Sequence, residues 1–384
     1  MFDFDQPMNR YASGSIKWQK YAGRDILPMW VADMDFAAPP AVIGALQQHL
    51  QQGDLGYAHP PATLAAQVAD FIAATHGWRI DPDWIVWLPG LVCGLNLACR
   101  AFGAAGVATL TPVYPPFLSA PQLAGQTLTR IDMLDIGNGW QIDFAQLRAR
   151  LRPQQLLLLC NPHNPVGRAY KREELQKLAQ LAAEFELTIC SDEIHADLVL
   201  DTERPHLPIA ALDADTGKRT LTLMAPSKTF NMPGLGSAFA IAESPAIRAR
   251  LKQVMAGIVP HPNSLAWPAM AAAYQHSRDW RLALLDYLRG NRDLLQQAIA
   301  ALPPLKMHHV QATYLAWIDC RALGGNPQAY FEAHGLGLSD GADFGAPGFV
   351  RLNFGCRREL LQQAITRLQQ ALKSANWPMT NDCL

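Results

Sequence analysis

The chain has 384 residues, of which 49% are hydrophobic and 17% are charged. This balance is typical of a folded protein and excludes a disordered chain, which buries too little apolar surface to fold. Lys plus Arg total 32 against 33 Asp plus Glu, so the net charge of -1 creates no basic field for nucleic acid or anionic lipid. We therefore expect a small-molecule substrate, with no nucleic-acid partner and no membrane partner.

The N-terminus and the cysteines both point to the cytoplasm. Asp3 and Asp5 stand where an export signal would have basic residues. The sequence has no run of about 18 apolar residues that would span a membrane. Its 7 cysteines include no Cys-x-x-Cys pair, and most lie in apolar runs, so we expect buried free thiols. We expect a cytoplasmic protein.

The length suggests about two to three domains, and the first long stretch indicates an α/β unit. From about Pro40 to Ser277, short apolar runs alternate with helical periods, as in βαβ units around a parallel sheet. Continuous apolar runs predict three buried strands, at Leu156–Cys160, Leu187–Cys190 and Leu221–Met224. Leucine and alanine at helical spacing predict a helix over 172–186, which gives one right-handed crossover.

The pattern changes after Ser277 and predicts a second, smaller unit. A long helix extends to about Leu302, where a doubled proline ends it. Strands follow at 314–319 and 349–354, and then an amphipathic helix over 360–372. The prediction is an α/β protein: a large domain with a mostly parallel sheet flanked by helices, plus a smaller α+β domain.

We divide the chain into three parts on this basis. Residues 1–45 form an N-terminal segment that packs with the small domain. Residues 46–277 form the large domain, and residues 278–384 form the small C-terminal domain. The two domains should pack closely, because no linker is long enough to separate them.

Polar residues follow each of the three predicted strands. Asn164 lies in an Asn-Pro-rich turn, Asp192 follows the second strand directly, and Lys228 follows the third. Taken singly, each has an ordinary explanation: a rigid turn, a solvated acidic turn and a surface lysine. Ligands of open α/β sheets bind at the carboxyl ends of the strands, where all three lie. Pyridoxal phosphate needs a lysine for a Schiff base and an aspartate for its pyridine nitrogen, so together they favour this cofactor.

Further motifs at the two ends of the chain make a family resemblance clear. The segments Leu27–Phe36, Ala225–Asn231 and Phe349–Asn353 occur in a characteristic order. In these motifs the chain resembles the fold-type I pyridoxal-phosphate enzymes of the aminotransferase class I/II family. Within that family it is similar to the MalY/PatB-type cystathionine β-lyases, or cysteine-S-conjugate β-lyases.

The resemblance implies a reaction, a cofactor and an assembly. The expected activity is β-elimination from L-cystathionine or a related cysteine thioether, which yields a thiol (homocysteine), pyruvate and ammonia in sulfur amino-acid metabolism. The expected cofactor is pyridoxal 5'-phosphate, and the expected assembly is a homodimer with shared active sites. The alternatives are an aminotransferase that acts on amino acids and a regulatory protein that binds the cofactor.

The resemblance also assigns roles to residues in the loops. Lys228 resembles the Schiff-base lysine, and Asp192 the carboxylate that faces the pyridine nitrogen. Asn164 resembles the asparagine that bonds the cofactor's phenolic oxygen, next to the substrate. Tyr114 resembles the stacking aromatic ring, although a core tyrosine is the alternative. Ser227 is also expected at the cofactor.

Three more assignments concern the phosphate, the substrate and the partner subunit. Gly90, Leu91 and Val92 open a predicted helix whose N–H groups suit a phosphate, although they also fit a plain helix start. Arg351 resembles the clamp for the substrate carboxylate, with a structural ion pair as the alternative. Tyr57 resembles a catalytic tyrosine that reaches the phosphate from the partner subunit.

Three positions depart from the aminotransferase pattern and resemble the lyase branch. Gly236 stands where aminotransferases usually have a phosphate-binding arginine, and Ala225 stands where many have a serine. His195, which we include among the cofactor-binding residues, stands where a tyrosine is common. Phosphate binding is therefore less well accounted for. We expect no metal site, because the 11 histidines show no ligand spacing.

Overall fold

The computed structural model describes residues 2–374. Its largest element is a 7-stranded sheet in the order β2-β10-β9-β8-β7-β3-β4. β10 is antiparallel to both of its neighbours, and the other neighbouring pairs are parallel. The strands are β2 (Ile85–Leu88), β3 (Val107–Thr111), β4 (Leu128–Asp132), β7 (Leu156–Cys160), β8 (Thr188–Asp192), β9 (Thr220–Met224) and β10 (Ala238–Ile241). The predicted mostly parallel sheet is confirmed.

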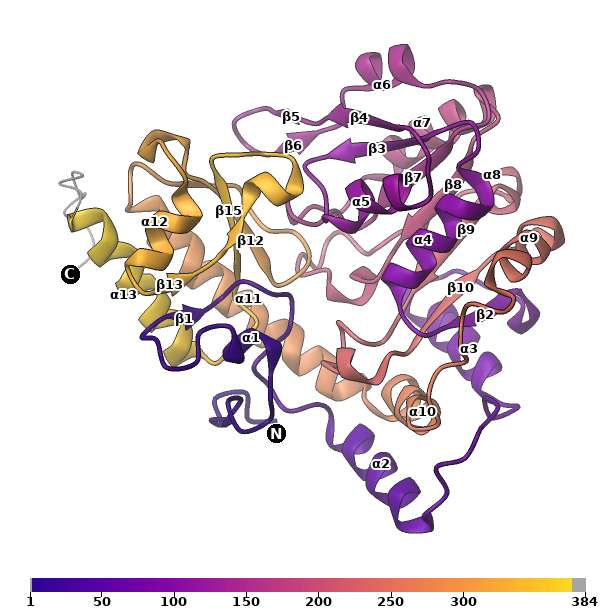
Figure 1. Cartoon of the computed structure of the whole chain (residues 1–384), viewed down its shortest axis with the longest axis horizontal. Helices are drawn as coiled ribbons and strands as arrows, with labels where there is room; N and C mark the ends of the chain where they lie inside the picture. Colours follow the sequence, from indigo (N-terminus) through magenta and orange to yellow (C-terminus); the bar gives the residue numbers. More distant parts are fainter. Residues whose placement is uncertain (1, 375–384) are drawn as a thin grey trace.

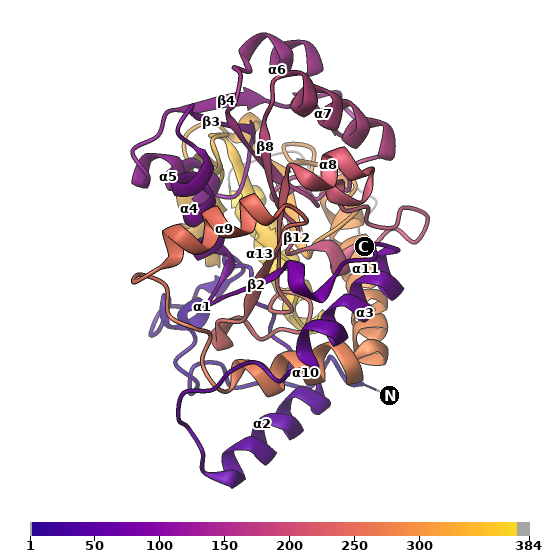
Figure 2. The same ribbon diagram turned by 90° about the vertical axis from the view of Figure 1, so that its right-hand side faces the viewer.

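Helices cover both faces of this sheet. Alternate side chains of β7 belong to two different apolar clusters, with Leu156 and Leu158 in one and Leu157 and Leu159 in the other. The first cluster includes residues of α4, α5 and α9, and the second includes residues of α6 and α7. Figure 2 shows α4, α5 and α9 on one side of the strands and α7 on the other. These helices are α4 (Leu91–Phe102), α5 (Pro116–Leu123), α6 (Phe144–Arg150), α7 (Arg172–Glu184) and α9 (Pro245–Met255).

The predicted elements of the large domain are present, with shifts at their ends. β8 continues to Asp192 instead of ending at Cys190, because Asp192 pairs in register with Cys160 of β7. The helix predicted over 172–186 is α7, which ends at Glu184. Glu186 has a φ of 52°, a left-handed conformation that an α-helix cannot contain.

The C-terminal part forms the predicted smaller domain around an antiparallel sheet of 4 strands, ordered β11-β12-β15-β14. Its strands and helices are β11 (Lys306–Met307), β12 (Leu315–Asp319), β14 (Ser339–Asp340), β15 (Phe349–Asn353), α11 (Arg278–Ala300), α12 (Pro327–Ala333) and α13 (Arg358–Ser374). In Figure 1 the long α11 runs from this domain toward the large one. The helix ends shortly before Pro303 and Pro304, as expected.

The N-terminal residues contact both domains. β1 (Leu27–Pro28) pairs in parallel with β13 (Leu336–Gly337) of the small domain, and Figure 1 shows the two side by side. α2 (Pro40–Gln52) packs instead against α10 (Ala266–His276) at the foot of the large domain. A division at residue 45 cuts α2, so we propose that the N-terminal segment ends at Pro39.

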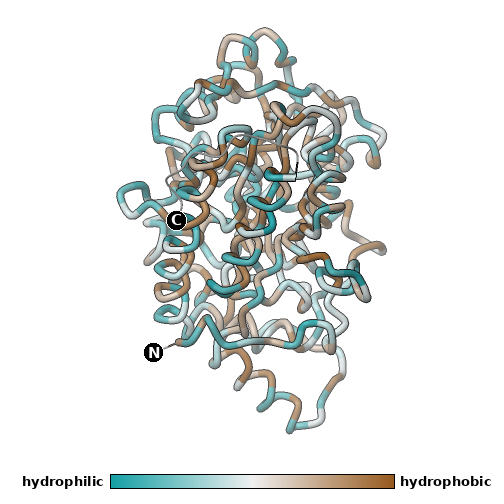
Figure 3. Tube along the Cα trace, turned by 90° about the vertical axis from the view of Figure 1, so that its left-hand side faces the viewer, coloured by the Kyte–Doolittle hydropathy of each residue, from teal (hydrophilic) through white to brown (hydrophobic). Residues whose placement is uncertain are grey.

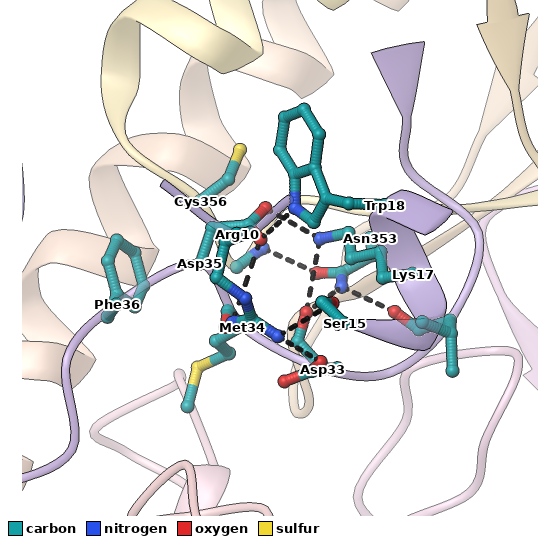
Figure 4. A network of polar contacts seen from close by, with 12 residues as sticks. Arg10, Ser15, Lys17, Trp18, Asp33, Met34, Asp35, Phe36, Asn353 and Cys356 are labelled. Carbon is teal, nitrogen blue, oxygen red and sulfur yellow. Dashed lines mark hydrogen bonds and ion pairs between the residues drawn. The ribbon is translucent and has the colours of Figure 1, made fainter. Parts of the chain in front are cut away.

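A buried polar network fastens the segment after β1 to the short helix α1 (Ile16–Gln19) (Figure 4). The side chain of Lys17 is fully buried and forms an ion pair with Asp35 at 2.7 Å. Trp18 donates from Nε1 to the other oxygen of Asp35 at 2.8 Å. Arg10 forms a second ion pair, with Asp33, at 2.5 Å. The network fixes a stretch of backbone that belongs to no sheet.

Apolar side chains fill the interior between these layers. In Figure 3 hydrophobic segments run through the middle of the molecule, where the buried strands lie. The cysteines within the described range are free, and all of them are buried except the half-buried Cys93. Cys383 lies outside the described residues. Among the helices of residues 2–374, none is long and apolar enough to cross a membrane.

The Lys17 to Asp35 ion pair generates a stability prediction. Lys17→Met should lower the free energy of unfolding by about 3 kcal/mol, because the substitution removes the nearest cation of the buried Asp35 carboxylate and leaves it only Arg10, whose Nη1 lies 3.8 Å away. Chemical denaturation measures the change. The same substitution at the exposed Lys252 is the matched control and should change the value by less than about 0.5 kcal/mol. Equal effects of the two substitutions would contradict a stabilising role for the ion pair.

Candidate active site

The loops after three neighbouring parallel strands meet at one edge of the large sheet. Cys160 of β7 pairs with Asp192 of β8, which pairs with Leu223 of β9. The carboxyl ends of parallel strands emerge at the same edge, so the loops after them lie together. Asn164, Asp192 and Lys228 line a single cavity of about 430 Å³.

Nearly all sequence-predicted site residues line this cavity. Besides Asn164, Asp192 and Lys228, the predicted residues in its lining are Gly90, Leu91, Val92, Tyr114, His195, Ser227 and Arg351. Tyr57 is the exception. Its side chain is fully exposed, and it lines a separate surface hollow together with His261 and Asn263. Within one subunit, the structure does not bring Tyr57 to the cavity.

Asp192 is a buried carboxylate without a cationic side chain bonded to it among the described residues. Its Oδ1 accepts a hydrogen bond from the backbone N–H of Ile194 at 3.1 Å. Burial raises the pKa of Asp192 to about 7, well above that of an ordinary aspartate. A buried carboxylate of this kind is costly unless a cation meets it, so the site favours a ligand with a positive charge at this point.

Lys228 extends into the cavity from the loop after β9. Its Nζ donates a hydrogen bond to the carbonyl oxygen of Ala32 at 2.5 Å. Burial lowers the pKa of Lys228 to about 8; the charge of Arg351 acts in the same direction, and Asp33 opposes both. A lysine with this pKa has a much larger neutral fraction near pH 7 than an exposed lysine. It is therefore a competent nucleophile and base.

Other side chains also bond the backbone around the carbonyl of Ala32, which accepts the hydrogen bond from Lys228. Tyr314 donates its hydroxyl to the same carbonyl of Ala32 at 3.1 Å. Asn353 of β15 donates from Nδ2 to the carbonyls on either side, those of Val31 at 2.7 Å and Asp33 at 2.9 Å. The sequence interpretation assigned no role to Ala32 or Tyr314. A backbone acceptor leaves no trace in residue type, and a tyrosine at the start of a buried strand resembles an ordinary core residue.

Arg351 brings the small domain to the cavity. It is 4% exposed, and its Nη1 donates to Oδ1 of Asn164 at 3.0 Å while Nη2 donates to the carbonyl of Trp30 at 3.1 Å. The guanidinium also lies over the ring of Phe344, 4.6 Å from its centroid. Within residues 2–374 its buried Nε has no hydrogen-bond partner, and this arginine forms no ion pair. Burial lowers the pKa of Arg351 to about 10, so it stays cationic at neutral pH.

The N-terminus of α4 supplies backbone donors. The helix begins at Leu91 with Gly90 as its N-cap, as predicted, and both residues line the cavity. The first N–H groups of an α-helix have no partner within the helix, and the helix dipole adds partial positive charge there. This arrangement suits an anion.

Tyr114 and His195 add ring surfaces to the wall. Tyr114 is half-buried, and its N–H donates to the carbonyl of Asn164 at 3.1 Å. His195 is buried, and burial lowers its pKa to about 3, so its imidazole is neutral. Its Nδ1 has no hydrogen-bond partner, and its ring meets that of Tyr314 edge-on at 6.1 Å.

Backbone geometry explains why Gly236 replaces an arginine. Its φ is +57°, and a Cβ added there would lie 3.0 Å from the carbonyl oxygen of Pro89. Any side chain at position 236 would therefore be strained and crowded. Gly236 and Ala225 both line the cavity without offering it a polar side chain.

Comparison with known families identifies the family. Residues 24–368 match the model of aminotransferase class I and II. The chain belongs to this family. The matched residues include both domains and every residue that we have described in the cavity. The resemblance inferred from sequence motifs is thereby confirmed.

Within the aminotransferase class I and II family, several of the relatives have lyase names. The chain is 35% identical to cystathionine beta-lyase PatB of Bacillus subtilis (strain 168), over 96% of this chain and all of that one. The sequence of OvoB, whose crystal structure is known, is 46% identical to this chain. The two structures match with a TM-score of 0.95 over 97% of this chain and 100% of OvoB. Cystalysin from Treponema denticola, whose structure contains pyridoxal 5'-phosphate, is 31% identical in sequence. Its TM-score is 0.92, over 98% of this chain and 100% of cystalysin.

Proposed function

We propose that the chain is a pyridoxal-phosphate-dependent carbon-sulfur β-lyase. It cleaves L-cystathionine or a related cysteine thioether to a thiol, pyruvate and ammonia. The observation that carries the proposal is one cavity lined by Lys228, Asp192, Asn164 and Arg351. The lyase names of PatB and of other relatives in the family support the choice of reaction.

The cavity fits the cofactor at each of its functional groups. The unpaired carboxylate of Asp192 matches a protonated pyridine nitrogen, and Lys228 matches the aldehyde. Free N–H groups of α4 match the phosphate, and the ring of Tyr114 matches the pyridine face. The side-chain amide of Asn164, which also lines the cavity, would donate a hydrogen bond to the phenolic oxygen. When bound, the cofactor supplies an electron-accepting ring that stabilises negative charge at the substrate's Cα.

The chain's own residues then divide the remaining work. Lys228 carries the cofactor and, once free, takes the Cα proton, a role that its lowered pKa suits. Asp192 holds a proton on the pyridine nitrogen by charge. An attraction of about 4 kcal/mol is expected for opposite charges roughly 4 Å apart at an effective dielectric of about 20.

Arg351 and Asn164 bind the substrate's carboxylate. The guanidinium of Arg351 is cationic, and its Nε has no partner. A bidentate pair with a carboxylate would fill this position and fix the orientation of Cα relative to Lys228. Because Arg351 also donates to Asn164, substrate and cofactor are aligned through one connected set of bonds.

We further propose a homodimer in which Tyr57 acts in the partner's site, and a cytoplasmic location. Tyr57 is an aromatic side chain that is exposed in a single subunit, next to the exposed Leu55. Exposed apolar groups of this kind mark interfaces. The free, buried thiols fit a reducing compartment.

An aminotransferase is the alternative, since it would use the same lysine and aspartate. Gly236 disfavours it, because it offers no side chain where we expected the arginine of aminotransferases, and its backbone would strain any larger residue there. The deciding assay compares two products from one holoenzyme. Cystathionine should yield pyruvate and ammonia in equal amounts, while amino transfer from alanine to an oxo acid should be slow. Faster amino transfer than pyruvate release across several β-substituted cysteines would replace the lyase by the aminotransferase.

Asp192→Asn should lower kcat about a thousandfold, because an amide holds no proton on the pyridine nitrogen by charge and about 4 kcal/mol is lost. Pyruvate release measures the change, and circular dichroism verifies the fold. Glu193→Gln is the matched control: the neighbouring carboxylate is equally buried but bonds His206 at 2.7 Å, and it does not line the cavity. Wild-type turnover in the Asp192 variant would exclude the proposed role.

The shared site predicts complementation between two inactive variants. Tyr57→Ala mixed with Lys228→Ala should recover about a quarter of wild-type activity, because half of the dimers are hybrids with one intact site. Lys228→Ala mixed with Asp192→Asn is the control and should recover none, since both residues belong to the same subunit's site. Hybrid dimers without activity in the first mixture would place Tyr57 outside the partner's site.

A further inference from the structure

Among the described residues, no charged side chain lines the cavity around the start of α4, which we call the phosphate end of the cavity. The residues that line the cavity around the start of α4 are Pro89, Gly90, Leu91, Val92, Cys93, Gly236 and Ser237. Gly236 excludes an arginine at its own position. Within this subunit a phosphate there depends on neutral donors, and the N–H groups of α4 are the first of them.

The topology of the sheet places Ser237 beside these N–H groups. β10 begins at Ala238, which pairs with Leu88, the last residue of β2. Continuing this antiparallel register by one residue sets Ser237 opposite Pro89, directly before the N-cap Gly90. A Cβ built on Gly236, the residue before Ser237, would lie 3.0 Å from the carbonyl oxygen of Pro89. This distance shows independently that the two segments lie close together.

The hydroxyl of Ser237 has no hydrogen-bond partner among residues 2–374. The residue is 2% exposed and lines the cavity, and its Oγ is buried without a hydrogen bond. A buried hydroxyl without a partner costs about 1 to 3 kcal/mol, so such groups usually serve a ligand or another function. No hydrogen bond holds the hydroxyl in its present position, and one rotation about Cα–Cβ takes it to another staggered position.

We propose that Ser237 donates its hydroxyl to the phosphate of the cofactor, beside the N–H groups at the start of α4. The hydroxyl thereby supplies a hydrogen bond where Gly236 offers no side chain. This inference rests on the cofactor part of the proposed function and is independent of the reaction that follows. It answers the question that the sequence left open, namely which side chain of this subunit holds the phosphate.

The test measures cofactor affinity and needs no turnover. The cofactor is removed from the purified protein, and the dissociation constants of pyridoxal phosphate and of pyridoxal, which lacks the phosphate, are measured by absorbance. Ser237→Ala should raise the dissociation constant of pyridoxal phosphate about tenfold, as expected for the loss of one hydrogen bond to a charged group. Pyridoxal affinity should stay within about twofold, since pyridoxal has no phosphate for the hydroxyl to bind.

Thr222→Val is the matched control. The Thr222 hydroxyl in β9 is also buried without a hydrogen bond, but it does not line the cavity. Its loss should leave the affinities for both ligands unchanged. Thermal unfolding adds a second readout: without cofactor, Ser237→Ala should be as stable as the wild type or more stable, because a buried unpaired hydroxyl is removed. With cofactor it should gain less stability than the wild type gains.

Two results would overturn the assignment. One is a pyridoxal phosphate affinity of the Ser237 variant within twofold of wild type, and the other is an equal loss for both ligands, which would show a general distortion. A wild-type chain that binds neither ligand would overturn the proposed function as a whole. Binding without pyruvate release would overturn the lyase reaction alone and leave the role of Ser237 standing.

Discussion

The site depends on one constraint: charged groups are buried in a cavity where they have no complete set of partners. Asp192 has a backbone N–H but no cation bonded to it, and the Nε of Arg351 has no acceptor. Among the described residues, the carbonyl oxygen of Ala32 is the one hydrogen-bond partner of Lys228 Nζ. Each of these missing partners costs free energy in the protein alone, and in the proposed function each is supplied by a group of the cofactor or the substrate. The fold thus holds these groups in place before any ligand binds, so that a ligand can supply the missing partners.

The large sheet creates this constraint through the direction of its strands. The ends of β7, β8 and β9 lie in register, so three loops of different sequence reach one place. The small domain contributes β15, whose Arg351 is bonded to Asn164 at 3.0 Å across the two units. In the proposed function, substrate bound at Arg351 would therefore contact both domains, and their relative position would set the geometry of the reaction.

The sequence predicted the sheet, the smaller domain and most of the cavity, because buried parallel strands are continuous apolar runs and their end loops are polar. It misplaced the end of β8, since Ser191 and Asp192 are polar although they pair in the sheet. It also missed Tyr314 and Ser237. The significance of both depends on neighbours far away in the chain, which no local pattern contains. Tyr57 stays a prediction, because its role requires a second subunit.

The carbonyl of Ala32 has a consequence for mutational scanning. This oxygen accepts from both Lys228 and Tyr314, and no substitution of Ala32 itself removes it. Its position is set by side chains elsewhere, such as Asn353 and the Lys17 to Asp35 ion pair. A scan would record sensitivity at those remote positions, whereas at Ala32, which is buried and lines the cavity, it would report only the effect of the added side-chain volume. A map of functional residues drawn from such data would place the effect far from the atom responsible for it.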